Sequence, residues 1–243
     1  MPEITALFID DGGVMNDDAL RVPEWHRLVA EFFVPILGGN RAQWVEANRV
    51  VFERLRVEVL TVGHQGQDYA KWLDEYQLRW LREMAALVHV AAPADDAQCI
   101  RLAEQAGASI TRRVRSIQPG AVEAIRALHS LGLNMFTASG EPSWELDGYL
   151  TGMDVRDCFQ VLYGPDLINQ AKENADYYRK VFAHAGVDPK RALVVDDSPS
   201  ALAWAQSVGA ATCLVNIVPP PNTRVDFVVS RLADLPAALG GSI

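Results

Sequence analysis

Cysteine is scarce in this sequence, and no combination of cysteine and histidine has the spacing of a zinc site. The chain of 243 residues has three cysteines, Cys99, Cys158 and Cys213, which are odd in number and far apart. A disulfide framework needs paired cysteines, so this usage argues against a disulfide-rich secreted protein and fits a reducing compartment. The five histidines are scattered along the chain, without zinc-ligand spacing. Neither a disulfide scaffold nor a zinc centre is expected.

An excess of positive charge and long apolar runs are also lacking. The formal net charge is −9 at pH 7, which argues against a uniformly basic face for nucleic acid, although a local cationic pocket for a small anion is still allowed. No apolar run approaches the roughly 20 residues that span a membrane. The chain starts with Met1-Pro2-Glu3 and enters its first apolar run without a basic leader. We therefore expect a cytoplasmic protein with no nucleic-acid or membrane partner; the oligomeric state is not predicted.

Short apolar runs alternate with helical patterns in the second half of the chain, and one more run lies near its start. Hydrophobic residues make up 49% of the chain, enough for a substantial core. The runs typical of strands cover residues 4–10, 131–136, 159–163, 191–195, 212–215 and 226–229. Strands that alternate with helices predict an α/β fold with a doubly wound, mostly parallel sheet.

The stretch from about residue 21 to residue 115 has a different character. Its apolar residues recur every three or four positions, which predicts helices around 25–32, 44–55, 69–81 and 95–107. Glycines at 38–39 and 63–66 and Pro93 separate these segments. We predict a helical domain at 18–114 inserted into a core domain of 1–17 and 115–243. Aromatic residues at helical spacing usually form core, so they indicate no site.

Carboxylates follow two of the predicted strands. The first strand leads into Asp10-Asp11-Gly12-Gly13-Val14, and the strand at 191–195 leads into Asp196-Asp197. Parallel strands place their carboxyl ends at one edge of the sheet, where α/β proteins bind ligands. Gathered carboxylates repel one another unless a cation lies among them, and Mg2+ with oxygen ligands is the usual cation. The sequence therefore predicts a magnesium site.

Two further residues extend this set. Thr137 supplies a hydroxyl at the end of a strand, and Lys172 supplies a positive charge in a polar stretch. Each has an ordinary alternative explanation: a turn cap for Thr137, a solvated helix start for Lys172, and a helix N-cap for the Asp196-Asp197 pair. Together, a nucleophilic carboxylate, a divalent ion, a hydroxyl and a lysine are what phosphoryl transfer needs.

The order of these motifs resembles the haloacid dehalogenase-like (HAD) superfamily of hydrolases, in its phosphatase-like branch with a helical cap. The motifs are Asp10-x-x-Gly-Val, Thr137, Lys172 and Asp196-Asp197-Ser-Pro-Ser, with the helical insertion after the first. The resemblance covers nearly the whole chain: 1–17 and about 115–235 are similar to the core. The insertion is similar to the cap in position and length but carries no motif. This implies a Rossmann-like core with an α-helical cap.

The resemblance also implies a role for each motif residue. Asp10 would attack phosphorus and become a transient aspartyl-phosphate, with Thr137 and Lys172 assisting catalysis. The implied substrate-binding residues are Thr137, Ala138 and Lys172. The implied Mg2+ ligands are Asp10, Asp196, Asp197 and the backbone carbonyl of Gly12. The expected activity is a Mg2+-dependent phosphatase that acts on a small phosphorylated metabolite.

One position departs from the pattern of these phosphatases. The residue two places after the nucleophile is usually a second aspartate, the general acid and base, and here it is Gly12. General acid–base catalysis is worth about 10²–10⁴-fold in rate, so alkyl phosphates should react slowly unless another acid substitutes. Asp17, Asp18 or a residue of the cap are candidates. Neighbouring strand residues face opposite ways, so Asp11 is expected to face away; a register with Asp11 as nucleophile recovers no acid.

Several functions survive the missing aspartate. The leading hypothesis is a phosphatase with a displaced acid or an activated substrate, such as an acyl or aryl phosphate. A phosphonatase would need a cap lysine to form a Schiff base, and the candidate, Lys71, lies in an ordinary amphipathic helix. Dehalogenation of 2-haloacids needs no metal, and unneutralised carboxylates at Asp196 and Asp197 would oppose an anionic substrate. The fourth possibility is a catalytically weak member that binds a phosphorylated ligand or a protein.

Overall fold

The computed structural model describes residues 3–64, 66, 68–216, 218 and 224–240, and the chain folds into two compact units. One unit comprises Met1–Asp18 and Ser116–Ile243, and the other comprises Ala19–Arg115. The second unit is thus an insertion into the first.

The first unit is built on a parallel sheet. Its six described strands are β1 (Ala6–Ile9), β2 (Asn134–Ala138), β3 (Val161–Tyr163), β4 (Ala192–Asp196), β5 (Ala211–Val215) and β6 (Phe227–Val229). Their order in the sheet is β3-β2-β1-β4-β5-β6, and every pairing is parallel. The predicted α/β class with a doubly wound sheet is confirmed. The direction of winding reverses next to β1, and ligands bind at such a switch point.

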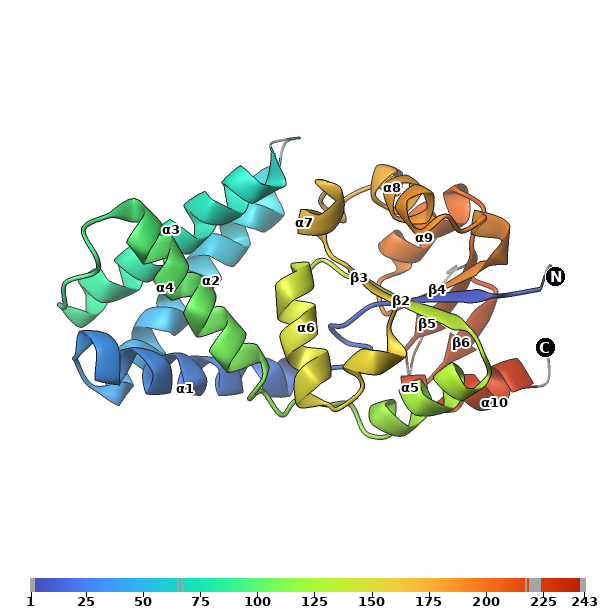
Figure 1. The fold of residues 1–243 in the computed structure, drawn as a ribbon, viewed down its shortest axis with the longest axis horizontal. Helices are drawn as coiled ribbons and strands as arrows, with labels where there is room; N and C mark the ends of the chain where they lie inside the picture. Colours follow the sequence, from blue (N-terminus) through green and yellow to red (C-terminus); the bar gives the residue numbers. More distant parts are fainter. Residues whose placement is uncertain (1–2, 65, 67, 217, 219–223, 241–243) are drawn as a thin grey trace. The chain divides into compact units, whose positions relative to one another are not determined.

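Helices cover both faces of this sheet (Figure 1). They are α5 (Ala121–Ser130), α6 (Ser143–Gly152), α7 (Pro165–Ile168), α8 (Ala175–Ala185), α9 (Pro199–Ser207) and α10 (Leu235–Gly240), with short 3-10 turns at Arg156–Cys158, Pro189–Arg191 and Leu232–Asp234. On the face covered by α8 and α9, Phe8 stacks on Phe136 at 4.8 Å between ring centroids and meets the edge of Phe182 at 5.0 Å. This buried aromatic cluster packs α8 against β1, the strand that Asp10 directly follows.

The structure of this unit differs from the prediction around β2 and α6. The strand predicted at 131–136 is β2, which covers Asn134–Ala138, because Leu131 ends α5 and Gly132 turns the chain with φ of 79°. Thr137 and Ala138 therefore lie inside the strand. Helix α6 was not predicted, since its apolar residues do not follow one clear helical face.

The second unit consists of the helices α1 (Asp18–Leu37), α2 (Arg41–Val62), α3 (Tyr69–Val88) and α4 (Asp96–Thr111). Asn40 begins α2 with a capping box, in which its side chain accepts from the Gln43 amide and the Gln43 side chain accepts from the Asn40 amide. Trp44 and Trp80 are buried, as expected for aromatic residues at helical spacing, and both contact Phe33, at 4.8 Å and 5.8 Å between ring centroids. None of the described helices is long and apolar enough to cross a membrane.

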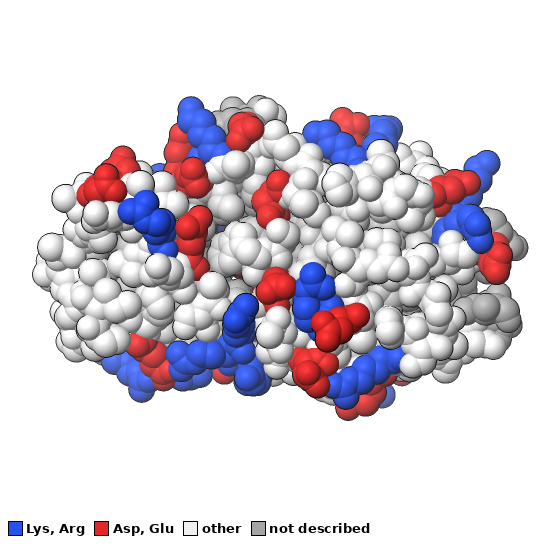
Figure 2. Space-filling view, viewed as in Figure 1, with Lys and Arg blue, Asp and Glu red and all other residues white. Residues whose placement is uncertain are grey.

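Charges of opposite sign are interleaved on the surface of the inserted unit, as seen on the face in Figure 2. Arg79 forms two 2.8 Å hydrogen bonds with Glu58, and Arg27 bonds Glu31 at 2.7 Å. Exposed pairs of this kind contribute only about 0–1 kcal/mol each. The stability of the unit therefore depends mainly on its apolar core.

One polar network lies inside that core. Asn48 Nδ2 donates to His26 Nδ1 at 2.7 Å, and Trp80 Nε1 donates to Asn48 Oδ1 at 2.8 Å. The Trp80 indole can only donate, so Asn48 Oδ1 is its acceptor and the Asn48 amide nitrogen faces His26. His26 Nδ1 therefore accepts a hydrogen bond and carries no proton, which means that the ring is neutral. Burial lowers the pKa of His26 further below its ordinary value.

We predict that this network makes the stability of the wild-type protein fall in mild acid. The unfolded state binds a proton at His26 below about pH 6.5, before the folded state does, so acid favours unfolding. The His26→Gln variant should lose less stability between pH 7.5 and pH 5.5 than the wild type, measured by urea denaturation. His129→Gln, at an exposed site of the other unit, is the control and should behave like the wild type. Equal losses in wild type and His26→Gln would refute the prediction.

Candidate active site

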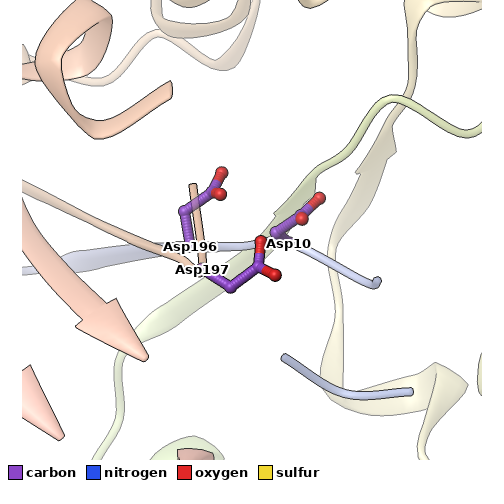
Figure 3. Close-up of side chains that lie close together, drawn as sticks. All are labelled: Asp10, Asp196 and Asp197. Carbon is purple, nitrogen blue, oxygen red and sulfur yellow. The ribbon is translucent and has the colours of Figure 1, made fainter. Parts of the chain in front are cut away.

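Three carboxylates meet where β1 and β4 end (Figure 3). Asp10 directly follows β1, Asp196 is the last residue of β4, and Asp197 comes next. One oxygen atom from each lies within 4.8 Å of the others. The register explains the arrangement: Ile9 pairs with Val195, so the parallel strands end at the same level.

A buried lysine links these carboxylates to β2. Lys172 lies in the loop between α7 and α8, and its Nζ is 3.0 Å from Asp10 Oδ1 and 2.7 Å from Asp196 Oδ2. The same ammonium donates to the Ala138 carbonyl at 2.8 Å. Its side chain is only 9% exposed. Lys172 thus holds the ends of β1, β2 and β4 together through one charged group.

The electrostatics of the site follow from burial and from an excess of negative charge. Burial raises the pKa of Asp10 well above its ordinary value, Lys172 opposes this, and Asp196 and Glu141 add to it. Burial disfavours the charged form of Lys172, but the nearby acidic groups, Asp10 first, raise its pKa overall. One ammonium therefore faces more carboxylates than it can neutralise.

The two aspartates after β4 have different environments. Asp196 is 1% exposed; its Oδ1 accepts from the Ser198 amide at 2.8 Å, and its Oδ2 meets Lys172 and the Tyr178 hydroxyl, the latter at 3.5 Å. Asp197 is half-buried, and burial raises its pKa to about 6, with Asp196 and then Asp18 adding to the shift and Lys172 opposing it. Asp196 is held in place by protein donors, whereas Asp197 is the more available ligand.

The turn after Asp10 leaves room for Asp197 only because it contains glycine. Gly13 has φ of 72°, and a Cβ atom there would lie 2.1 Å from Asp197 Oδ2. Next to it, the Asp11 carboxylate accepts from Asn16 Nδ2 at 2.7 Å, and Asn16 accepts from the Ser116 hydroxyl at 2.8 Å. Asp11 therefore braces the turn. Gly12 pairs with Asn16 in the same turn.

The described residues fit a hard divalent cation. Asp10 Oδ1 is buried and accepts no hydrogen bond of good geometry from the described part of the chain, although the Lys172 ammonium lies 3.0 Å from it as an ion pair. The donor set around it consists of carboxylate oxygens, which Mg2+ prefers over nitrogen or sulfur ligands. A cation here would offset the negative charge that Lys172 leaves.

The end of β2 forms the next part of the site. Thr137 is buried, and its hydroxyl donates to the Tyr163 carbonyl at 3.3 Å, between β2 and β3. Ala138 is level with Asp10, one position beyond the Ile9–Thr137 pair, and its carbonyl receives Lys172. The structure therefore brings Ala138, Lys172 and the three aspartates together, while the Thr137 hydroxyl is engaged inside the sheet.

Several residues near the site were missed from the sequence. Tyr177 and Tyr178 were assigned only to a helix face, yet both are fully buried, and the Tyr177 hydroxyl donates to the Ser139 carbonyl at 2.9 Å. The Ser139 hydroxyl donates to the Glu141 carboxylate. Two adjacent tyrosines on the apolar face of a helix could have indicated these contacts, because a buried tyrosine hydroxyl needs a hydrogen-bond partner. Ser139 and Glu141 could have been identified from their position just after a strand whose carboxyl end lies at the site.

With this geometry, the chain can be compared with known proteins. The family model described as "Hydrolase: haloacid dehalogenase-like hydrolase" matches residues 4–209. The chain therefore belongs to the haloacid dehalogenase-like hydrolases, as its motifs predict.

The curated relatives that the chain matches are named as phosphatases. The chain is 29% identical to hexitol phosphatase B of Escherichia coli (strain K12) over 118 residues, which cover 49% of this chain and 52% of the relative. It is 27% identical to a phosphoglycolate phosphatase of Rhodospirillum rubrum over 101 residues, 42% of each protein. The chain spans about half the length of the curated relatives it matches.

Solved structures share the fold over nearly the whole chain. The 2-haloacid dehalogenase from Pseudomonas syringae pv. Tomato DC3000 superimposes with a TM-score of 0.67 at 16% identity, covering 99% of this chain and 100% of that one. The HAD phosphatase from Thermococcus onnurineus gives a TM-score of 0.62 at 18% identity, covering 98% and 99%. Both dehalogenases and phosphatases have this fold, so the function has to be argued from the site.

We predict that Lys172→Met strongly destabilises the protein. Removing one partner of a buried ion pair leaves uncompensated charge and costs about 3–5 kcal/mol. The free energy of unfolding, measured in urea with a chelator present, should fall by this amount. Lys190→Met, at an exposed position, is the matched control and should change it little. A loss no larger than in the control would show that Lys172 does not stabilise the site.

Proposed function

We propose that this protein is a Mg2+-dependent phosphatase that acts on a small phosphorylated metabolite through an aspartyl-phosphate on Asp10. The observation that carries the proposal is the group of three carboxylates around a buried lysine at the switch point of the sheet. The phosphatase names of the curated relatives support the same reaction class.

In this proposal Asp10 is the nucleophile, and Lys172 binds the phosphoryl oxygens while it keeps Asp10 in position. Asp10, Asp197 and the Gly12 carbonyl would hold Mg2+; Asp196 would contribute its charge and orient Lys172, which it contacts at 2.7 Å. Bound Mg2+ supplies charge neutralisation to the phosphoryl group. The same positive groups would stabilise the charge that develops on phosphorus during transfer.

The β2 end would form the wall of the phosphate site. We assign substrate binding to Thr137 and Ala138 together with Lys172. Ala138 already lies beside the ammonium of Lys172. The Thr137 hydroxyl donates to the Tyr163 carbonyl, so it would have to exchange that acceptor for a phosphoryl oxygen.

The inserted helical unit would act as the cap that selects the substrate. This role rests on its place in the chain, between β1 and α5, and the family match extends across it. A phosphonatase would need a cap lysine shielded from water to form a Schiff base. The Lys71 side chain is 79% exposed and lies 3.8 Å from Glu75, which is an ordinary surface arrangement.

Dehalogenation is less well supported by the site. The dehalogenases among the solved structures share the fold with this chain at low sequence identity. Such a likeness is no evidence that this chain acts on the same substrates. A metal-free site with Asp10, Asp196 and Asp197 in one group would repel the carboxylate of a 2-haloacid. The same charge would bind a cation and, through it, a phosphate.

We predict that Asp10→Asn abolishes turnover, because an amide is too weak a nucleophile to form the phosphoenzyme. Phosphate release should be measured from phosphomonoesters, acyl phosphates and phosphonates, with Mg2+ and with a chelator. The wild type should release phosphate only with Mg2+, and Asp10→Asn should remain at background. Asp157→Asn, at an exposed position, is the control. Full activity of a folded Asp10→Asn variant would rule out Asp10 as the nucleophile. Phosphate release by the wild type in the presence of the chelator would rule out a requirement for Mg2+.

We predict that Gly13→Ala weakens Mg2+ binding, because its Cβ would displace the Asp197 carboxylate. Changes next to a ligand typically cost about 10–100-fold in metal affinity. Gly132→Ala is a matched control: Gly132 has φ of 79°, close to the 72° of Gly13, but no atom lies within 4 Å of the added Cβ. Calorimetric titration with Mg2+ measures the affinity. Equal affinities in the two variants would argue against Asp197 as a ligand.

A further inference from the structure

We propose that Glu141 is the general acid and base of this enzyme, in place of the side chain that Gly12 lacks. The inference rests on the proposed phosphatase function and deepens it, because it identifies the source of the proton for the leaving group.

The backbone places Glu141 at the edge of the sheet where Asp10 lies. It follows three residues after β2, whose last residue, Ala138, is level with Asp10. The segment between them is held at two carbonyls: that of Ala138 receives Lys172 at 2.8 Å, and that of Ser139 receives the Tyr177 hydroxyl at 2.9 Å. The loop therefore has a defined path next to the nucleophile.

A close packing contact holds Glu141 itself. A Cβ atom at Gly164, just after β3, would lie 2.3 Å from the Glu141 carbonyl oxygen, so only glycine allows the two backbones to approach. The Ser139 hydroxyl donates to the Glu141 carboxylate, and the Glu141 amide is 3.4 Å from the same hydroxyl. Ser139 is fully buried, so the Glu141 side chain is oriented by a rigid part of the protein.

The charge of Glu141 acts on the nucleophile. Its carboxylate raises the pKa of Asp10, after the larger effects of burial, Lys172 and Asp196. Asp18, an alternative acid from the sequence, acts instead on Asp197. Asp196 is engaged by Lys172 and the Ser198 amide, and Asp11 binds Asn16. Among these carboxylates, Glu141 is the one that acts on Asp10 and is not part of the proposed metal site or the turn.

The proposed step moves one proton in each half of the reaction. As Asp10 attacks phosphorus and the bond to the leaving oxygen breaks, the protonated Glu141 carboxyl gives its proton to that oxygen, which leaves as the alcohol. The Glu141 carboxylate then takes a proton from a water molecule whose oxygen attacks the phosphorus of the aspartyl-phosphate. Asp10 is released, and the products are the alcohol and inorganic phosphate.

The test compares Glu141→Gln with the wild type on an alkyl phosphate, glycerol phosphate, and on an aryl phosphate, p-nitrophenyl phosphate. The nitrophenolate of the aryl phosphate is a good leaving group without protonation, whereas the alkoxide of glycerol phosphate needs a proton from an acid. We expect turnover of glycerol phosphate to fall by about 10²-fold or more. With p-nitrophenyl phosphate the variant should release one equivalent of nitrophenolate in a burst, followed by slow turnover as the phosphoenzyme waits for water. The Kd for Mg2+ should not change.

A second variant and a control separate catalysis from folding. Glu141→Ala should recover turnover of glycerol phosphate when formate or acetate is added, because a small carboxylic acid can occupy the vacated space. Glu123→Gln, at an exposed position on α5, should behave like the wild type.

Three results would overturn the inference. The first is a Glu141→Gln variant as active on glycerol phosphate as Glu123→Gln. The second is an equal loss on both substrates without a burst, or no recovery with small acids, which would indicate a purely structural role. The third is a wild type that hydrolyses p-nitrophenyl phosphate but not alkyl phosphates. A wild type that releases no phosphate from any substrate with Mg2+ would instead refute the proposed phosphatase, and the role of Glu141 with it.

Discussion

The buried ion pairs of Lys172 are the interaction on which the rest of the site depends. A single ammonium, 9% exposed, contacts Asp10 at 3.0 Å and Asp196 at 2.7 Å and donates to the Ala138 carbonyl at 2.8 Å. These partners come from the ends of β1, β4 and β2, so one side chain from a loop ties three strands together at their carboxyl ends. An ammonium buried to this degree is tolerated only because several acceptors replace its water. The arrangement of α7 and α8, which flank the loop, therefore matters directly to the chemistry.

The charge that Lys172 leaves uncompensated explains the other features of the site. Burial raises the pKa values of Asp10 and Asp197, which means that ionising all the carboxylates of this group is costly. A divalent cation would remove this cost, and the glycine at position 13 leaves the space in which Asp197 approaches it. Binding of a cation and ionisation of the nucleophile would thus support each other. Under the proposed function, the same negative group would favour a metal-bound phosphate over a bare organic anion.

Under the proposed function, the glycine at position 12 would separate two tasks, nucleophilic attack and proton transfer. The turn after β1 would provide the nucleophile, Asp10, and a backbone carbonyl for the cation, while the hydrogen bond from Asn16 to Asp11 braces this turn. The proposed proton donor lies instead in the loop after β2, where Ser139 and Gly164 fix Glu141. Both loops follow neighbouring strands of one parallel sheet, so a group can move from one to the other and still lie near the reacting atoms.

The sequence by itself determined the α/β class and the residues at the ends of the strands, because these are local properties. An apolar run followed by Asp10 or by Asp196-Asp197 is visible in a few consecutive residues, and parallel pairing then brings such ends together. Only the tertiary structure decided that β2 starts at Asn134, after a left-handed turn at Gly132, and that the Thr137 hydroxyl donates to the Tyr163 carbonyl. It also decided which groups surround Asp10: Tyr178 reaches Asp196 across 18 positions of sequence, and Glu141 acts on Asp10 from the loop after β2. Such contacts join residues that are far apart in the chain, and no local pattern encodes the distance between them.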